Sequence, residues 1–420
     1  SYSVTGVQTC ALPILLIAGS HSWEIGARYV LPVNQAACIE EMKMTPTAEQ
    51  NEIIEFAGRM TNEDSLTVTA YAGAAKTSTL IMMANAYPNA RFLYLAFNKA
   101  IVEEARAKFP KNVEIKTTHS LAYGYTVGKR RVRNNYRAAE IAEMFRLDFE
   151  EASYVLNIFD FYCNSALSDL SQLSTIDSSI LNVVSEMYDR MRSGEIEITH
   201  SWYLKEFQLQ LLAGKTIKSN YDFSLLDEAQ DTNSVTLSIF NNLPGKKVRV
   251  GDSHQAIYLF RGAINGINDR GGASGKNTRK SLTTTFRCLP HIVDQANWIL
   301  GTFKGEKQKI VSGNNNEATI ETMAILSRTN STLIEKMDEL GDFNLTRAPE
   351  IIFESLLSVL NWKYGFDHEV SRNFKFLKRF KTMGELTEYI ETADDQELRM
   401  AVKILEKYDN QEWKIGRAHV

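Results

Sequence analysis

Two short segments combine the residue types that phosphate chemistry requires. The first is the turn AGAAKT, which follows a strand pattern at Leu66–Ala70 and precedes a helical pattern from Ser78. A glycine-containing turn between a strand and a helix points backbone N–H groups and the positive end of the helix dipole at phosphate oxygens. Lys76 would reach the β- and γ-phosphates, and the hydroxyl of Thr77 would bind magnesium.

The turn departs from the usual phosphate-loop pattern at both of its consensus glycines. Ala70 and Ala75 occupy those positions, which leaves Gly73 as the only glycine. If residue 75 requires a positive φ, alanine costs about 1–2 kcal/mol there. The alternative is an ordinary strand-turn-helix without a ligand. The phosphate reading predicts a run of nucleotide contacts at Gly73, Ala74, Ala75, Lys76, Thr77 and Ser78.

The second segment is LLDEAQD, in which an apolar strand ends in two adjacent carboxylates. Asp227 would hold the metal through water, and Glu228 would polarise the attacking water. Acidic residues after a strand can also simply cap a helix. Two further polar segments, VGDSHQAIYLFRGA at 250–263 and TTFR at 284–287, favour the catalytic reading.

Strands alternate with helices around these segments. Thr45 or Thr47 can cap a first helix, strands are expected at Phe92–Phe97 and Val113–His119, and a helix is expected at Lys99–Lys108. Such alternation predicts a parallel sheet with right-handed crossovers. Residues 121–218 are mostly helical in pattern, and strands return at Tyr221. The pattern therefore predicts one α/β domain interrupted by a helical insertion.

The order and spacing of DEAQD, GDSHQAIYLFRGA and TTFR resemble the second, third and fourth motifs of UvrD/Rep-type superfamily 1 helicases, in particular the F-box DNA helicase branch. FLYLAFNKAIVEEA and TTHSLAYGY resemble motifs Ia and Ib of that family, and THSWYLKEFQL and AILSRTN resemble further family segments. The resemblance spans about Thr45 to Tyr408, and no F-box is visible. It implies an α/β fold: a RecA-like P-loop motor domain with a parallel sheet and a helical insertion, and a partial second RecA-like domain with its own helical insertion.

The resemblance also implies domain boundaries. The first RecA-like domain is expected at 44–120 and 215–275, its insertion at 121–214, the start of the second domain at 276–330, and the second, partial insertion at 331–413. No motif V follows that insertion, so we expect motifs V and VI to be missing from this sequence.

The family also implies roles for residues outside the AGAAKT turn and the LLDEAQD segment. Gln50 lies where the family reads adenine, and Phe286 would pack on that base. Gln255 would sense the γ-phosphate or position water, and Arg287 would act as an arginine finger. The alternatives are a surface ion pair for Arg287 and structural hydrogen bonds between core loops for Gln255 and Arg261. Arg261 would make such bonds by bracing Glu228.

Strand-end and aromatic residues are the candidates for nucleic-acid contacts. Asn98, Thr117 and His119 lie at strand ends where the family contacts the DNA backbone, although His119 is equally well explained as a structural histidine. Tyr258 and Phe260 would stack on bases at about 1–3 kcal/mol each, or fill the core. The predicted nucleic-acid contacts are Asn98, Thr117, His119, Tyr258, Phe260 and Arg261.

Charge and composition limit the partners. The basic runs Lys129–Arg137 and Phe374–Lys381 suit phosphate contacts, or else form solvated faces. A net charge of -4 neither requires nor excludes a nucleic-acid partner. The four cysteines form no CxxC pair, which fits a reducing compartment. No apolar run reaches the roughly 18 residues that a membrane span needs.

Both ends of the sequence have an unusual composition. Val4–Ile14 resembles the translation of a common DNA-sequencing adapter, and Ile415–Val420 resembles its reverse complement. We therefore expect residues 1–41 to be a non-native leader and 414–420 an artefact tail, with a natural start at Met42 or Met44.

The sequence thus predicts an ATP- and Mg²⁺-dependent helicase or translocase that acts on single-stranded DNA and duplex junctions, with 3′ to 5′ polarity implied by the family. We expect a cytoplasmic protein from a prokaryote or virus, or a nuclear one from a eukaryote. Two alternatives stay open: an ATP-binding single-strand sensor with little hydrolysis, which Ala75 favours, and a non-enzymatic nucleic-acid-binding scaffold. An RNA substrate and the oligomeric state are left open.

Overall fold

The computed structural model describes nine segments of the chain, which fall into two compact units. The first unit contains the described residues between 45 and 314, and the second contains those at 14–18 and between 322 and 408. The described segments are 14–18, 45–215, 217–257, 263–269, 275–314, 322–326, 344–345, 353–392 and 395–408.

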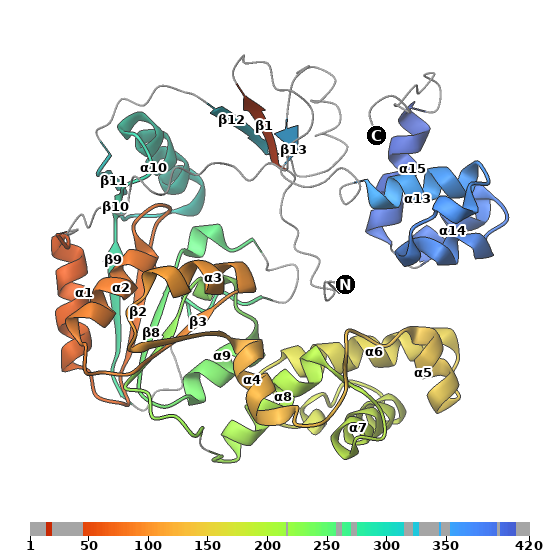
Figure 1. The fold of residues 1–420 in the computed structure, drawn as a ribbon, viewed down its shortest axis with the longest axis horizontal. Helices are drawn as coiled ribbons and strands as arrows, with labels where there is room; N and C mark the ends of the chain where they lie inside the picture. The colour runs from red at the N-terminus through yellow and green to blue at the C-terminus, as the bar shows by residue number, and fades with distance from the viewer. Residues whose placement is uncertain are drawn as a thin grey trace. The chain divides into compact units, whose positions relative to one another are not determined.

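A six-stranded parallel sheet forms the centre of the first unit (Figure 1). Its strand order is β4-β3-β7-β8-β2-β9. The strands are β2 (Ser65–Ala70), β3 (Phe92–Ala96), β4 (Val113–Thr117), β7 (Phe223–Leu226), β8 (Lys246–Gly251) and β9 (Asn277–Leu282). Because every neighbouring pair is parallel, the loops after the strands gather at one edge of the sheet.

Helices cover both faces of this sheet. α1 (Ala48–Arg59), α2 (Lys76–Ala86) and α3 (Lys99–Lys108) pack on one face, and α9 (Ser234–Asn242) packs on the other. β3 shows the underlying pattern, since Phe92 and Tyr94 enter one core and Leu93 and Leu95 enter the other. A strand with two buried faces reads as a continuous apolar run, which is the FLYLA of the sequence.

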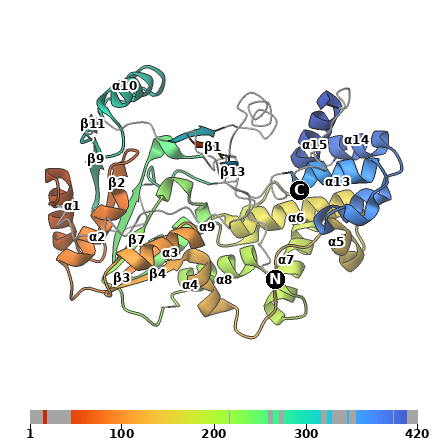
Figure 2. The same ribbon diagram turned by 45° about the horizontal axis from the view of Figure 1, so that its top comes forward.

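The predicted helical insertion is present between β4 and β7 (Figure 2). It contains α4 (Thr118–Thr126), α5 (Ala138–Phe145), α6 (Phe149–Asn164), α7 (Ser178–Ser193) and α8 (His200–Leu212), with a small pair of strands, β5 (Val132–Arg133) and β6 (Ile198–Thr199). A short 3-10 helix, η2, spans Leu170–Gln172.

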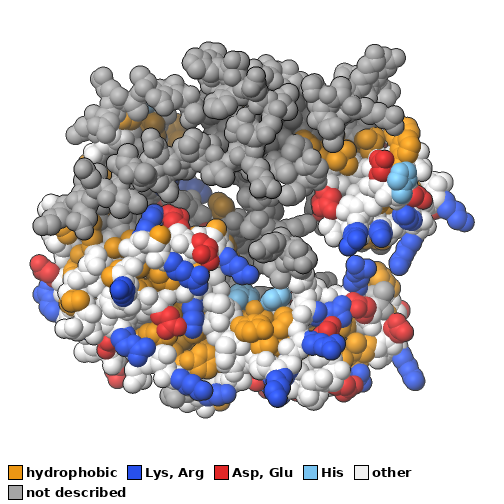
Figure 3. Space-filling view, in the orientation of Figure 1, with side chains coloured by type: hydrophobic (Ala, Val, Ile, Leu, Met, Phe, Trp, Pro, Cys, Tyr) orange, Lys and Arg blue, Asp and Glu red, His pale blue; other side chains and the backbone are white. Residues whose placement is uncertain are grey.

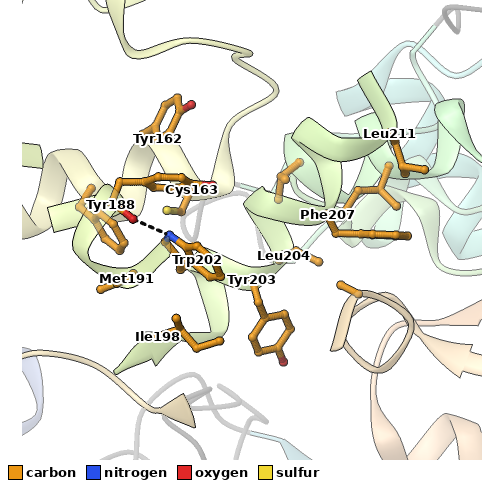
Figure 4. Close-up of a cluster of buried hydrophobic side chains, with 14 of the residues drawn as sticks. Tyr162, Cys163, Tyr188, Met191, Ile198, Trp202, Tyr203, Leu204, Phe207 and Leu211 are labelled. Carbon is orange, nitrogen blue, oxygen red and sulfur yellow. Dashed lines mark hydrogen bonds between the residues drawn. The ribbon is translucent and has the colours of Figure 1, made fainter. Parts of the chain in front are cut away.

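The core of the insertion centres on Trp202 and Lys205 of α8. The indole N–H of Trp202 donates to the carbonyl of Tyr188 at 3.1 Å, while its ring is fully buried with Tyr162 and Cys163 nearby (Figure 4). The ammonium of Lys205, also buried, donates to the carbonyls of Ser165 and Leu167. These contacts hold the turn after α6 against α8.

Two sequence expectations about element boundaries need correction. β9 pairs with β2 along Asn277–Leu282, so the first sheet continues past residue 275, where we expected the domain to end. The segment NTRKSL lacks an apolar run because an edge strand buries few of its side chains. In addition, β4 ends at Thr117 rather than at His119, because Thr117 caps α4 with its side-chain oxygen.

The chain after β9 continues within the first unit as β10 (Thr284–Thr285), α10 (Pro290–Lys304) and β11 (Val311–Ser312). β10 and β11 form a parallel pair. The N-terminus of α10 has proline at its first position, where the missing N–H carries no cost.

The second unit contains a small sheet and a group of helices. Its sheet has the order β12-β1-β13, from Thr322–Leu326, Ile14–Ala18 and Asn344–Leu345. β1 lies within the predicted leader, and the other predicted terminal residues lie outside the described segments, so their artificial origin stays a prediction. The helices are α13 (Glu354–Lys363), η6 (Asp367–Glu369), η7 (Arg372–Arg379), α14 (Met383–Thr392) and α15 (Gln396–Tyr408). Among the described helices of the chain, none is long and apolar enough to cross a membrane.

Candidate nucleotide site and strand-binding surface

The turn between β2 and α2 has the backbone of a phosphate loop. Gly73 has φ 75°, and Ala75, the residue before α2, has φ 56° and ψ 41°. Residue 75 therefore has the positive φ on which the cost of an alanine depends. Alanine pays about 1–2 kcal/mol for it, because its Cβ crowds the following carbonyl. The surrounding structure therefore imposes this backbone conformation, which alanine does not favour by itself.

Two of the predicted phosphate contacts, Ala74 and Ser78, have different surroundings in the turn and in the first turn of α2. The N–H of Ala74 donates to the carbonyl of Tyr71 at 3.0 Å, and its side chain is buried in the core. Ser78 lies half-buried in the first turn of α2. Contacts from both residues to a nucleotide stay predictions.

Lys76 and the carboxylates after β7 meet across the sheet edge. Lys76 Nζ lies 2.7 Å from Glu228 Oε2. Gln230 Nε2 donates to the same carboxylate oxygen at 2.8 Å, so Glu228 is held from two sides. Glu228 itself has φ 49° and ψ 45°, a second non-glycine residue in the left-handed conformation. Strained backbone at a carboxylate that faces a phosphate loop is typical of functional sites.

Asp227 is almost fully buried. Its side chain lies at the end of β7 with a relative exposure of only 4%. Its Oδ1 accepts the backbone N–H of Glu228 at 2.9 Å, and its Oδ2 accepts the hydroxyls of Tyr94 at 2.6 Å and Thr77 at 3.2 Å. Burial, followed by the neighbouring Glu228 carboxylate, raises the pKa of Asp227 above its ordinary value.

The pair formed by Thr77 and Asp227 fits a magnesium ion that arrives with a nucleotide. Magnesium in such sites takes one hydroxyl and one carboxylate from the protein and completes its shell with water and phosphate oxygens. A cage of three or more His, Cys, Asp or Glu side chains is absent from the described residues.

Gln255 lies on the 3-10 helix η4 (Ser253–Gln255), directly after β8. Its Nε2 donates to Asp252 Oδ2 at 2.7 Å, and the backbone N–H of Asp252 donates to Gln230 Oε1 at 3.0 Å. Gln230 therefore joins Glu228 to the segment that carries Gln255. Arg261, predicted to brace Glu228, lies outside the described residues, as do Tyr258 and Phe260.

The segment after β9 packs directly on the phosphate loop. The N–H of Phe286 donates to the carbonyl of Gly73 at 3.0 Å. A Cβ on Gly73 would lie 2.5 Å from Arg287 Cβ and 2.6 Å from Thr285 Oγ1, so this close approach requires glycine. The Arg287 side chain is exposed, and its guanidinium makes no hydrogen bond or ion pair within the described segments. The surface-ion-pair alternative for Arg287 finds no support there.

The two predicted adenine contacts have different surroundings. Phe286 is 45% exposed, which leaves its ring accessible to a base. Gln50 is buried: its Oε1 accepts the N–H of Thr47 at 2.9 Å, and its Nε2 donates to Thr79 Oγ1 at 2.9 Å. In this structure Gln50 caps α1 and ties it to α2, and reading of adenine by Gln50 stays a prediction.

Three predicted DNA contacts lie at the strand ends of the first unit. Asn98 and Thr117 use their side-chain oxygens to cap α3 and α4, where they accept the N–H groups of Ile101 and Ser120. His119 lies exposed in the first turn of α4, with its ring edge-on to Tyr203 at 6.0 Å. The capping role limits Asn98 and Thr117 to contacts that leave these bonds intact.

An aromatic group beside His119 was not singled out from the sequence. Tyr123 of α4 is half exposed, and it and His200 both pack edge-on against Tyr203. The Tyr203 hydroxyl lies 2.9 Å from His200 Nδ1. Figure 3 shows histidine side chains beside hydrophobic ones on this face. The spacing of His119 and Tyr123, four residues apart on one helix, was the available signal.

The two basic runs differ in the structure. In the first, Arg130 donates to the carbonyls of Thr126 and Arg192, and Arg133 pairs with Glu140 at 2.8 Å, so both cations brace the insertion. In the second, the cations are exposed and lack ion pairs within the described residues. These exposed cations are Lys375, Lys378, Arg379 and Lys381.

Comparison with known proteins agrees with this geometry. Residues 196–270 match the family model of the UvrD/REP helicase N-terminal domain. Over these residues the chain is similar to that helicase domain. The matched range includes α8, Asp227, Glu228 and Gln255. The predicted resemblance to UvrD/Rep-type helicases is confirmed, and so is the α/β fold with a parallel sheet.

Named relatives extend the similarity along most of the chain. The F-box DNA helicase 1 of Gallus gallus is 28% identical over 428 residues, which cover 89% of this chain and 41% of the relative. The F-box DNA helicase protein 1 of Schizosaccharomyces pombe is 26% identical over 85% of this chain and 46% of its own length. A probable DNA helicase II homolog of Mycoplasma genitalium is 25% identical over half of this chain. The chain spans less than half the length of these relatives.

Proposed function

We propose that this chain is the nucleotide-binding part of an ATP-driven DNA helicase or translocase that moves along single-stranded DNA. The observation that carries the proposal is the convergence of Lys76, Thr77, Asp227 and Glu228 at one edge of the sheet. A lysine and a hydroxyl from a phosphate loop, facing a buried aspartate and a neighbouring glutamate, form the set that hydrolysis of a phosphoanhydride needs. A non-enzymatic scaffold has no use for this set.

The ion pair between Lys76 and Glu228 must open when ATP enters. Lys76 would exchange the Glu228 carboxylate for the β- and γ-phosphates, a move of one flexible side chain. Glu228 would then be free to polarise a water molecule, while Gln230 keeps its carboxylate in place. Bound magnesium would neutralise charge on the phosphates, held by Thr77 and Asp227.

Arg287, in the segment after β9, would contribute positive charge to the site. Arg287 is anchored by its backbone next to Gly73, and its guanidinium is unpaired among the described residues. An arginine in that state can turn toward a γ-phosphate without breaking an existing contact, and stabilise the charge that develops there. We therefore propose Arg287 as the arginine finger, and Phe286 as a contact to the base.

The proposed substrate is single-stranded DNA and its junctions with duplex. The relatives are named DNA helicases, and the exposed Tyr123 and His119 lie on α4, which Thr117 caps at the end of β4. Exposed rings next to backbone-capping residues suit stacking of bases along a strand. Polarity from 3′ to 5′ and a role in DNA repair or recombination follow from the family resemblance. The proposed location is the cytoplasm for a prokaryotic or viral protein and the nucleus for a eukaryotic one.

A strand sensor that binds ATP without turnover is the second candidate, because the strained Ala75 lies in the phosphate loop itself. Nucleotide binding and phosphate release, measured on the same preparations, separate the candidates. A motor binds MgATP and releases phosphate, and Glu228→Gln lowers release about 10²–10⁴-fold while binding persists. A sensor binds and does not release phosphate, and turnover arises only in Ala75→Gly. If neither the unsubstituted chain nor Ala75→Gly binds MgATP, the proposal is contradicted.

A further inference from the structure

Tyr94 is a buried tyrosine whose hydroxyl reaches the proposed metal ligand, Asp227, from the neighbouring strand β3. It lies in the middle of β3, fully buried, and its hydroxyl donates to Asp227 Oδ2 at 2.6 Å. The same oxygen accepts the Thr77 hydroxyl. Tyr94 lies within FLYLAFNKAIVEEA, the segment that resembles motif Ia, but the sequence predicted no role for it because FLYLA has the pattern of a plain buried strand.

The sheet register explains how the two side chains meet. Tyr94 pairs with Leu225 of the parallel strand β7, two residues before Asp227. Residues two apart on a strand point to the same face, so Asp227 lies on the face that receives the Tyr94 ring, one step closer to the edge. The phenol spans this step and places its hydroxyl under the carboxylate.

The ring of Tyr94 is held on all sides by apolar neighbours. It packs at 4.7 Å from Phe109 and lies in the core that includes Phe92 and Phe223. Phe92, two residues earlier on the same face, has no hydroxyl, and its ring stacks on that of Phe223 with a centroid distance of 4.6 Å. Packing in this core therefore does not require a hydroxyl. What the hydroxyl adds at residue 94 is the bond to Asp227.

That bond removes the last freedom of the carboxylate. The backbone N–H of Glu228 fixes Oδ1, and Tyr94 fixes Oδ2 on the side of Thr77. A carboxylate held at both oxygens needs no reorganisation when a cation arrives. Partners that orient a metal ligand from behind in this way are commonly worth 10- to 100-fold in metal affinity.

We infer that Tyr94 is a positioning residue that fixes Asp227 in the orientation that receives the divalent cation of a bound nucleotide. The inference rests on the proposed function, since it needs a nucleotide and a cation at this site. It assigns to Tyr94 no contact with either of them.

The test is the magnesium dependence of nucleotide binding by the 420-residue chain, followed with a fluorescent ADP analogue. Tyr94→Phe keeps the ring and removes only the hydroxyl. The magnesium concentration at half-maximal binding should rise about tenfold or more, with affinity in EDTA unchanged. The matched control is Tyr136→Phe, which removes a hydroxyl bonded to the Glu197 carbonyl at 2.8 Å in the insertion and should shift neither quantity.

Three results would overturn the inference. An unchanged magnesium midpoint in folded Tyr94→Phe shows that the hydroxyl does not position the ligand. An equal loss of affinity in EDTA and in magnesium, with a lowered Tm, shows a general structural role. If the unsubstituted chain binds the nucleotide without any effect of magnesium, the proposed function fails as well, whereas the first two results leave it standing.

Discussion

Ala75→Gly tests the strain in the phosphate loop. Ala75 has φ 56° and ψ 41°, where an alanine costs about 1–2 kcal/mol relative to glycine. Glycine gives back about 0.4–1 kcal/mol through its more flexible unfolded chain. The free energy of unfolding should therefore rise by about 1 kcal/mol, measured by urea denaturation at constant slope.

Two controls bracket this value. Ala72→Gly, in the same turn but without a positive φ, should lower the free energy of unfolding by about 0.4–1 kcal/mol. Arg146, which ends α5 with φ 57°, is left-handed but remote from the loop, so Arg146→Gly should stabilise about as much as Ala75→Gly and leave nucleotide affinity alone. If Ala75→Gly destabilises as Ala72→Gly does, the strain reasoning is refuted.

Three further predictions follow from the structure. Gly73→Ala should lower the free energy of unfolding by at least about 2 kcal/mol, because it adds left-handed strain to contacts of 2.5 and 2.6 Å. Gly124→Ala, in open space within α4, should instead raise it by up to about 1 kcal/mol. Equal effects of the two substitutions in thermal unfolding would contradict the close packing of Arg287 on the loop. Arg287→Ala should leave stability within about 0.5 kcal/mol and nucleotide binding intact, while phosphate release falls about 10³-fold or more; a change in binding alone would instead assign Arg287 to ground-state contact. Burial lowers the pKa of Lys205 to about 8, below its unfolded value, so the folded chain binds fewer protons than the unfolded chain between pH 8 and 10.5. The free energy of unfolding should therefore rise with pH in that window, by on the order of 3 kcal/mol relative to Lys205→Met. If the two proteins give parallel curves of stability against pH, Lys205 titrates normally.

The sequence predicted most of the elements that carry the site. β3 and β7 are short, mainly apolar runs, which are readable because both faces of a parallel sheet are buried. β2 and β8 instead alternate, with apolar residues at Leu66, Val68 and Ala70 and at Val248 and Val250. The helix at Lys99–Lys108 begins and ends as predicted, since Asn98 gives it a side-chain cap. Local chemistry was sufficient in these places.

The misses have a common physical origin in contacts between distant segments. β9 was overlooked because an edge strand has little apolar signal, and its place is set by hydrogen bonds to β2 more than 200 residues earlier. Tyr94 and Gln230 gain their roles from groups on other strands, Asp227 and Asp252. Gln50 shows the reverse case, in which a residue predicted to bind a ligand is engaged by a local cap and by Thr79.

The basic runs show why composition alone does not separate binding surfaces from internal braces. Both runs have similar charge density in the sequence. Arg133 is paired with Glu140, whereas Lys375 and Lys378 face solvent. The difference depends on where acidic partners fold, which the spacing of cations does not encode.

The most direct test of the motor is ATP hydrolysis with and without single-stranded DNA, measured on the protein extended to the length of its relatives. The unsubstituted protein should release phosphate several-fold faster when single strands are added, and Glu228→Gln should remove this turnover while MgATP still binds. Hydrolysis that ignores DNA, or that persists in Glu228→Gln, would contradict the account.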